Sequence, residues 1–416
     1  MMRLAFLAFL CLQAAPAQTA PSELLKQIQL RVAGSLAHLP NYTCRQTIER
    51  FSRPADSKRF ILQDRLRLDV ALIEGKELYA WPGSPRFEDK AIFDVVGGGA
   101  VGSGNFATHL RNLFLKPGAQ FTLVGKEEMA GQKAWRFDFR VPLERSEFTI
   151  REGSERAIVG YYGSIWADGE TFDLLRLEAN VDQIPPPLTI TKSADVIEYG
   201  RVRIGGADFM LPKTAEMTLF SPVVDNRNVT HFEGCRQYVG ESVLSFVDPQ
   251  TAADAAKPVE KVNLPAGLNV EMNLATPIDK EKSAVGDELT AVLYRPLRLD
   301  GKILLPKGAH FHGRISRMEL RRTTALTYHV IGVLLDSVEA QGRRGEFHGV
   351  LEDAGLTINA SFHVPYQRNP GRQFNIWTNF RHETALPKPD EGVFYVRGDI
   401  LRLTPGMRLL WRTAAP

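Results

Sequence analysis

The sequence predicts a mainly β protein with two β-rich parts. A strongly curved antiparallel sheet, or unclosed β-barrel with covering helices, comes first, and a smaller C-terminal β-barrel or sandwich follows. Apolar and polar residues alternate with a period of two, as in Trp135, Phe137 and Phe139 against Arg136 and Asp138. Turns rich in glycine separate these runs. A chain of 416 residues exceeds one typical core, which favours two domains.

Two helical segments interrupt the strand pattern. The first is predicted over 22–38, with Ser22 as its cap. Its apolar residues recur every four positions, at Leu24, Ile28, Val32 and Leu36. The second is predicted over 105–116. These amphipathic segments are the local candidates to cover one face of the curved sheet.

Ten strands are expected in the first part of the chain. They are predicted over 42–52, 65–70, 77–81, 121–128, 134–141, 158–166, 172–180, 194–204, 209–219 and 230–246. Short turns between successive strands predict an antiparallel meander. We expect a first domain over 18–246, a linker over 247–262 rich in Ala, Asp, Lys and Pro, and a C-terminal domain over 263–416.

The N-terminus has the order of a secretory signal peptide. Arg3 supplies a positive charge, an apolar run follows, and Ala15-Pro16-Ala17 gives a small-x-small cleavage site. The apolar run is shorter than the about 20 residues that a bilayer span needs. Residues 1–17 are therefore predicted to be a cleaved signal peptide, and the mature protein to be periplasmic or secreted. No later window resembles a transmembrane span.

Cleavage would leave two cysteines, Cys44 and Cys235, each in a predicted strand. Laterally paired strands bring Cα atoms within disulfide range, and an oxidising compartment favours the bond. We expect a disulfide between them. Two buried free thiols are the alternative.

Several patterns in the sequence match known sites for chemistry only in part. The segment Gly97–Gly104 lacks the Gly-Lys-Ser/Thr end of a phosphate loop and the βαβ frame of a dinucleotide loop, so it predicts a flexible hinge of a lid. No G-x-S-x-G elbow or H-E-x-x-H helix occurs. His310 and His312 share a strand face but lack a third ligand. No catalytic residue, cofactor or metal site is predicted, although a pair of carboxylates for hydrolysis could escape notice.

The charge of the chain does not indicate a nucleic-acid partner. The net charge is +3, which by itself implies neither nucleic acid nor an anionic membrane. A local basic cluster contains Arg314, Arg317, Arg321 and Arg322. Aromatic residues are not interleaved with it, as a single-strand groove would require, so a solvated strand is expected.

Apolar strand faces give the candidate binding residues. The candidates to line a lipid cavity are Leu66, Leu68, Trp135, Phe137, Phe139, Leu175 and Leu177. Ordinary packing of a filled core is the alternative for the same residues.

A pattern of strand and turn segments over about 40–246 resembles the periplasmic lipoprotein-carrier (LolA-like) family. It includes Gly131–Phe137, Gly163–Asp168, Leu174–Glu178, Ile197–Val202 and Phe209–Pro212. The resemblance implies an unclosed β-barrel around a hydrophobic cavity that holds acyl chains under helical lids. A disulfide between Cys44 and Cys235 is not a feature of that family, and we expect it to restrict opening of the barrel.

The C-terminal part is similar to the β-domain of conjugation and type IV secretion scaffold proteins. The matching segments are Leu264–Gly267, Val285–Asp287 and Gly301–Ala309. The resemblance implies a module for assembly without catalysis.

These observations predict a non-enzymatic envelope protein. We expect the first domain to bind an acyl chain, lipid or lipoprotein, and the second to dock an envelope protein. A structural or assembly protein without a ligand cavity is the alternative, followed by an unrecognised hydrolase.

Overall fold

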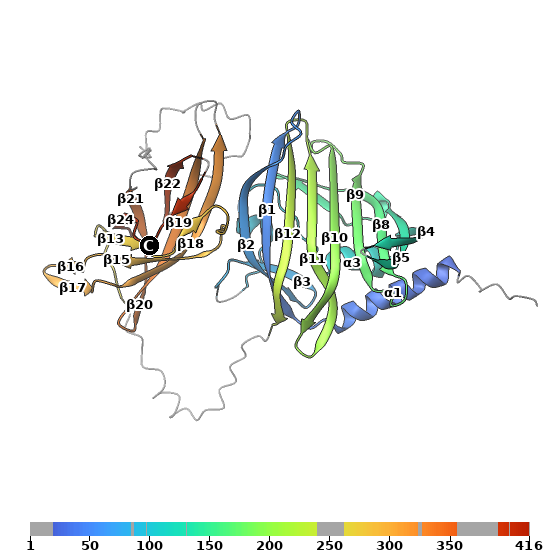
Figure 1. The fold of residues 1–416 in the computed structure, drawn as a ribbon, viewed down its shortest axis with the longest axis horizontal. Helices are drawn as coiled ribbons and strands as arrows, with labels where there is room; N and C mark the ends of the chain where they lie inside the picture. Colours follow the sequence, from blue (N-terminus) through green and yellow to red (C-terminus); the bar gives the residue numbers. More distant parts are fainter. Residues whose placement is uncertain are drawn as a thin grey trace, which may run out of the picture.

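The structure is a computed structural model that describes residues 20–84, 87–96, 98–129, 131–238, 262–322, 327–355, 390–398 and 400–415. Within these ranges the chain forms two β-rich halves that lie side by side (Figure 1). The predicted signal peptide and all of the predicted linker except Val262 lie outside the described residues. The domain boundaries therefore stay a prediction.

The described part of the N-terminal half contains one curved, antiparallel sheet of ten strands. Their order across the sheet is β3-β2-β1-β12-β11-β10-β9-β8-β5-β4. The strands are β1 (Tyr42–Pro54), β2 (Ile61–Ile73), β3 (Lys76–Ala80), β4 (Gln120–Met129), β5 (Gln132–Val141), β8 (Gly160–Asp168), β9 (Leu174–Asp182), β10 (Lys192–Ile204), β11 (Ala207–Phe220) and β12 (Val224–Gln237). A small hairpin, β6 (Thr149–Glu152) and β7 (Glu155–Ile158), lies beside it. The predicted curved sheet is confirmed.

Helices cover the concave face of this sheet. Helix α1 (Pro21–His38) runs across the strands and buries its apolar stripe against them (Figure 1). It begins with Pro21, whose fixed φ suits the first helical position, and Ala20 rather than Ser22 is at the N-cap. The buried stripe consists of Leu24, Ile28, Val32 and Leu36, as predicted.

The connection between the two edge strands of the sheet also covers its concave face. Because β3 and β4 are consecutive in sequence but lie at opposite edges, residues 81–119 must cross the open side. This crossover carries α2 (Ile92–Val96), α3 (Thr108–Leu110) and the π-helical turn η1 (Arg111–Leu115). A further turn, η2 (Leu143–Arg145), follows β5. Phe106, Leu110, Leu113 and Phe114 of the crossover are buried in the core.

The C-terminal half is built on a second sheet, with eight strands among the described residues. The order is β20-β19-β18-β15-β13-β24-β21, and β22 pairs with β19. The strands are β13 (Asn269–Leu274), β15 (Glu288–Leu293), β18 (His310–Arg322), β19 (Thr327–Ala340), β20 (Arg343–Glu346), β21 (Gly349–Gly355), β22 (Glu391–Arg397) and β24 (Arg408–Thr413). Two short pairs accompany them, β14 (Ile278–Asp279) with β23 (Arg402–Leu403) and β16 (Leu297–Leu299) with β17 (Lys302–Leu305).

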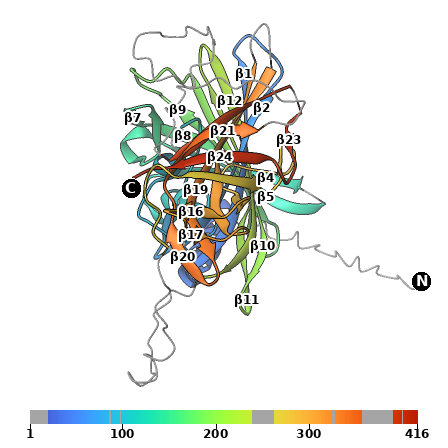
Figure 2. The ribbon, with the colours of Figure 1, turned by 90° about the vertical axis from the view of Figure 1, so that its left-hand side faces the viewer.

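An aromatic cluster forms the centre of the second sheet. Trp411 is fully buried and meets Phe347 edge to face, and Phe347 meets Phe311 in the same way. Figure 2, viewed from this half, shows β24 and β21 crossing in front of strands of the first sheet. Buried apolar residues of both halves form one contiguous cluster.

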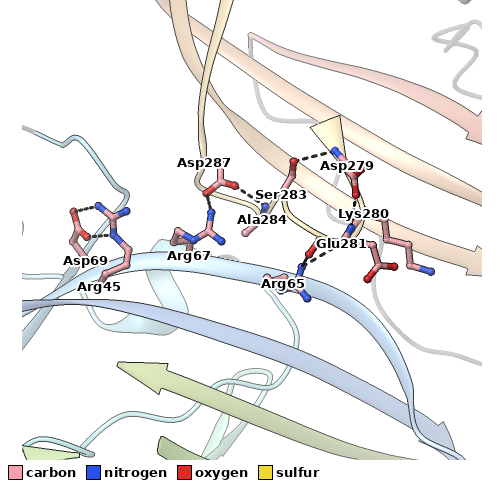
Figure 3. Close-up of polar contacts among 10 residues, drawn as sticks. All are labelled: Arg45, Arg65, Arg67, Asp69, Asp279, Lys280, Glu281, Ser283, Ala284 and Asp287. Atoms are coloured by element: carbon pink, nitrogen blue, oxygen red, sulfur yellow. Dashed lines mark hydrogen bonds and ion pairs between the residues drawn. The ribbon is translucent and has the colours of Figure 1, made fainter. Parts of the chain in front are cut away.

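The two halves join at strand β2 (Figure 3). Val285 exchanges backbone hydrogen bonds with Arg65 and Arg67, each 2.8 Å long. The Arg67 guanidinium pairs with Asp287, and the Arg65 guanidinium donates to the carbonyl oxygens of Lys280 and Glu281. The turn 284–287 therefore docks on β2 through both backbone and charge.

A disulfide joins Cys44 to Cys235, with Cα atoms 4.1 Å apart. It links β1 to β12, which are already neighbours in the middle of the sheet. The open side lies between the edge strands β3 and β4, which the disulfide does not bridge. The expectation that this bond restricts opening stays a prediction, and a link between neighbouring strands does not by itself favour it.

Candidate ligand-binding site on the concave face

Helix α1 is held to the sheet by a buried carboxylate. Asp173, just before β9, has a side chain that is only 4% exposed. It accepts a hydrogen bond from Arg31 of α1 at 2.5 Å and pairs also with Arg201 of β10. A buried carboxylate is favourable only when it is paired, so this contact selects one position of the helix.

A small cavity of about 20 Å³ lies beneath this contact. That is about the volume that one water needs. Its lining is mainly apolar and comes from α1, the crossover and the sheet: Arg31, Val32, Ser35, Leu36, Leu39, Phe106, Leu110, Asp173, Leu174, Tyr199 and Met210. The cavity thus lies where the helix, crossover and sheet meet.

The predicted lining residues lie in the same interior but are tightly packed. Leu66, Leu68, Phe137, Phe139 and Leu177 are each at most 4% exposed. A side chain with so little accessible surface touches almost no space that water could enter. In this conformation these five pack as core, and their role in lining a cavity stays a prediction.

The other two predicted residues differ. Trp135 is half-buried, and the Lys126 ammonium lies 4.3 Å from its ring centroid. Leu175 is half-buried and is the extra residue of a β-bulge, because Leu174 pairs with Ala167 and Arg176 with Trp166. Neither lies among the residues around the small cavity.

Buried polar side-chain atoms without a hydrogen-bond partner occur in both halves of the described chain. In the N-terminal half they are the Tyr42 and Tyr199 hydroxyls, Ser52 Oγ, Trp135 Nε1 and Asn228 Oδ1; in the C-terminal half they are Glu271 Oε2, His348 Nε2 and Trp411 Nε1. Alternation along their strands places the first five on the face that carries the core. Most buried polar groups in proteins are hydrogen-bonded, so five unpartnered atoms on one face are free to meet a polar group of a ligand.

The glycine-rich segment of the crossover is anchored rather than free. Arg50 donates to the Gly98 carbonyl oxygen at 2.6 Å, and Asn228 donates to that of Ala100 at 2.8 Å. The Gly104 N–H donates to Glu77 at 2.9 Å. These three long-range bonds oppose the predicted flexible hinge; Gly97 lies outside the described residues.

Burial shifts the pKa values of one carboxyl and one imidazole in this half strongly. Asp195 lies on β10 on the same face as Ile197, and burial raises the pKa of its carboxyl to about 7. His109 is in the crossover, and burial lowers the pKa of its imidazole to about 4, although a hydrogen bond that the ring donates to the Ser103 backbone opposes this shift. Both shifts follow from the low polarity of this interior.

The other features singled out from the sequence lie in the C-terminal half, where His310 and His312 line an open pocket of about 360 Å³. His310 and His312 have ring centroids 6.2 Å apart, and no group of three metal-ligating residues occurs in the part of the chain that the structure describes. Arg314 pairs with Asp336 and Arg321 with Glu319. Arg317 was expected to be solvated, but its side chain is only 10% exposed because it pairs with the buried Glu391.

The chain was compared with known proteins. No family model and no curated protein matches it. A solved "putative outer membrane lipoprotein-sorting protein domain" from Vibrio parahaemolyticus resembles it with a TM-score of 0.28 and 10% identity, over 56% of this chain and 96% of that one. A DUF1329 family protein from Desulfovibrio piger gives a TM-score of 0.27 and 12% identity, over 54% and 96%.

At these scores the likenesses carry no weight in assigning a function. The resemblance of the C-terminal half to secretion scaffold proteins receives no support from them. Within the described ranges, no helix is long and apolar enough to cross a membrane.

Proposed function

We propose that the protein is a non-enzymatic component of the cell envelope. Its N-terminal half would bind a hydrophobic ligand, an acyl chain, a lipid or a lipoprotein, between the curved sheet and α1. The observation that supports this most is that an amphipathic helix, α1, covers the concave face above a small cavity. The helix is attached there by one specific ion pair, between Arg31 and Asp173.

The apolar burial that α1 provides is similar in free energy to the burial of one acyl chain, so the two could exchange on the sheet. Full burial of one large apolar side chain contributes about 1.5–3 kcal/mol, so the four of α1 contribute about 6–12 kcal/mol. A sixteen-carbon acyl chain gains about 12 kcal/mol at about 0.8 kcal/mol per buried methylene. Since these amounts are similar, an acyl chain can replace the helix on the sheet without a large net cost.

The proposal places the protein outside the cytoplasm. A cleaved signal peptide over 1–17 would export it, and a disulfide is typical of oxidising compartments. The C-terminal half would dock an envelope protein. Its firm contact with β2 gives such a partner a fixed position relative to the ligand site.

A structural protein without a ligand is the second candidate. It is favoured by the near-complete packing of the five predicted lining residues. In that case α1 would be a permanent part of the core, and the pair of Arg31 with Asp173 would be a purely structural contact.

Ligand uptake separates the two candidates. Protein stripped of lipid on a hydrophobic resin is titrated with a fluorescent sixteen-carbon fatty-acid analogue, and native mass spectrometry checks the untreated protein for a retained lipid. The proposal expects saturable uptake of one equivalent. No uptake, and no retained lipid, would support the structural candidate.

A matched pair of variants tests whether the ligand binds at the small cavity. Leu36 lines the cavity, whereas Leu30 lies on the same helix and is 58% exposed. Leu36→Ala enlarges the cavity and should raise the affinity several-fold, while Leu30→Ala should leave it unchanged. Equal effects of the two substitutions would place the ligand elsewhere.

A further inference from the structure

Glu77 carries a partly buried hydrogen-bond network between β3 and the crossover. Its carboxylate accepts from the Tyr79 hydroxyl at 2.6 Å, from the Gly104 N–H at 2.9 Å and from the Phe106 N–H at 3.0 Å. Every partner is a donor, so the carboxylate acts only as an acceptor. The network places a negative charge inside the half-barrel.

Two further tyrosines face the same interior. Tyr42 pairs with Leu72, and Leu72 pairs with Glu77, so Tyr42 and Glu77 occupy one row across three strands. Tyr42 is 1% exposed and Tyr199 is 8% exposed. Both hydroxyls are buried without a hydrogen-bond partner, although a hydroxyl can donate one bond and accept others.

These tyrosines adjoin the small cavity. Tyr199 lines it directly. Phe106 lines it too, and the Phe106 ring meets the Tyr42 ring edge to face with centroids 5.7 Å apart. A ligand that enlarges this cavity meets Tyr199 directly, and it meets Tyr42 as well if it displaces the Phe106 ring.

Burial and the Glu77 charge raise the pKa of Tyr42 and of Tyr199 well above the ordinary value. Both hydroxyls therefore stay protonated and remain available as donors. The Glu77 carboxylate would repel an anion that approached these hydroxyls, because like charges repel strongly in an interior of low polarity.

We propose that Tyr42 and Tyr199 bind the polar end of the ligand, and that Glu77 makes this site selective for a neutral acceptor such as an ester carbonyl over a carboxylate or phosphate. The inference rests on the proposed function, because it assigns a headgroup preference to the same interior. It predicts that the preferred cargo is an esterified acyl chain. A free fatty acid of the same length binds more weakly.

The test compares three ligands with the same sixteen-carbon chain: a monoacylglycerol, the free fatty acid and the alkyl trimethylammonium. Affinities are measured on the full chain at pH 8 by competition with a fluorescent acyl probe. The monoacylglycerol should bind about tenfold more tightly than the fatty acid, as expected for two net hydrogen bonds. The double variant Tyr42→Phe/Tyr199→Phe should weaken binding of the monoacylglycerol and so remove this preference.

Two variants control the result. Tyr162→Phe changes an exposed tyrosine of the same sheet and should alter no affinity. Glu77→Gln removes the charge and should strengthen binding of the fatty acid alone.

The outcomes distinguish the inference from the function on which it rests. Binding of none of the three ligands contradicts the proposed function itself. Equal binding of ester and acid overturns the inference and leaves the function standing. A preference for the trimethylammonium, or an ester preference that persists in the double variant, also overturns it.

Discussion

Val285 pairs with Leu66 in a parallel β-bridge, and this pair joins the two halves of the molecule. Strand β3 pairs with β2 only from Asp69 to Ile73, which leaves the preceding part of β2 without β3 as a neighbour. An open sheet edge is a template for pairing with other chains. The turn that carries Val285 covers this edge as a strand would (Figure 3).

Gly286 allows this close approach, and replacing it tests the junction. A Cβ atom at this position would lie 2.3 Å from the Arg67 carbonyl oxygen and 2.6 Å from the Trp81 ring. Gly286→Ala should therefore open the junction. The measurement is hydrogen–deuterium exchange of a peptide covering 61–73, in which the Arg67 amide should lose protection.

Gly267→Ala is the control for backbone strain. Gly267 has a φ of +90° against +100° for Gly286, but nothing lies within 4 Å of its added Cβ. Both substitutions carry a strain cost of about 1–3 kcal/mol, whereas only Gly286→Ala meets β2. If the two variants change protection of 61–73 equally, the junction does not depend on the approach of Gly286.

The disulfide can be tested for stability and for function separately. A double Cys44→Ala/Cys235→Ala variant removes a link across 191 residues and should lower the free energy of unfolding by about 2–5 kcal/mol in chemical denaturation. Ligand uptake should be unchanged, because the bond joins neighbouring strands away from the open side. Faster uptake in the variant would show that the bond does restrain opening.

Much of the fold could be predicted from the sequence because apolar, buried residues alternate with polar, exposed ones along most strands. β12 shows where this fails. A strand was predicted over 230–246, but β12 begins at Val224. Its first half carries the inward-facing Asn226 and Asn228 instead of apolar residues, so pairing with β1 and β11 fixes it rather than hydrophobic periodicity.

The candidate site was less predictable because its key contacts are distant in sequence. Arg31 and Asp173 are 142 residues apart, and Glu77 reaches Phe106 across 29 residues. Neither pairing has a local pattern. Tyr42 and Tyr199 gave a signal, because each occupies an inward position of a predicted strand, 42–52 or 194–204, although it carries a polar group.

The contact between Arg31 and Asp173 should control how readily α1 leaves the sheet. Arg31→Ala removes the ion pair between α1 and Asp173, and Asp173 keeps its ion pair with Arg201. Because Arg31 is 46% exposed, the loss of stability should be at most about 1 kcal/mol. The rate of fluorescent acyl-chain uptake in stopped flow should rise several-fold.

Arg227→Ala is the matched control for that rate. Arg227 is exposed to a similar degree, 38% against 46% for Arg31, and it pairs with Glu216 on a neighbouring strand without a helix. Its removal should leave uptake unchanged. An unchanged rate in Arg31→Ala would instead mean that the apolar stripe alone holds α1.

Asp195 should make stability fall as pH rises. Its pKa is raised from 3.8 to about 7 because burial disfavours the charged form. Between these values the folded protein binds a proton that the unfolded chain does not, so this contribution is complete below about pH 4 and is lost as pH rises through 7. The full shift would correspond to about 4 kcal/mol, at about 1.4 kcal/mol per unit.

Partial exposure reduces this figure, since Asp195 is half-buried. We expect Asp195→Asn to be more stable than the wild type by about 1–3 kcal/mol at pH 8 and equal to it at pH 4. Urea unfolding across this range gives the difference, and Asp208→Asn, at an exposed position, should follow the wild type. Because His109 titrates with the opposite sign between about pH 4 and 6.5, only the difference between wild type and variant isolates Asp195. A difference that does not change with pH would mean that the Asp195 carboxyl titrates as it does in the unfolded chain.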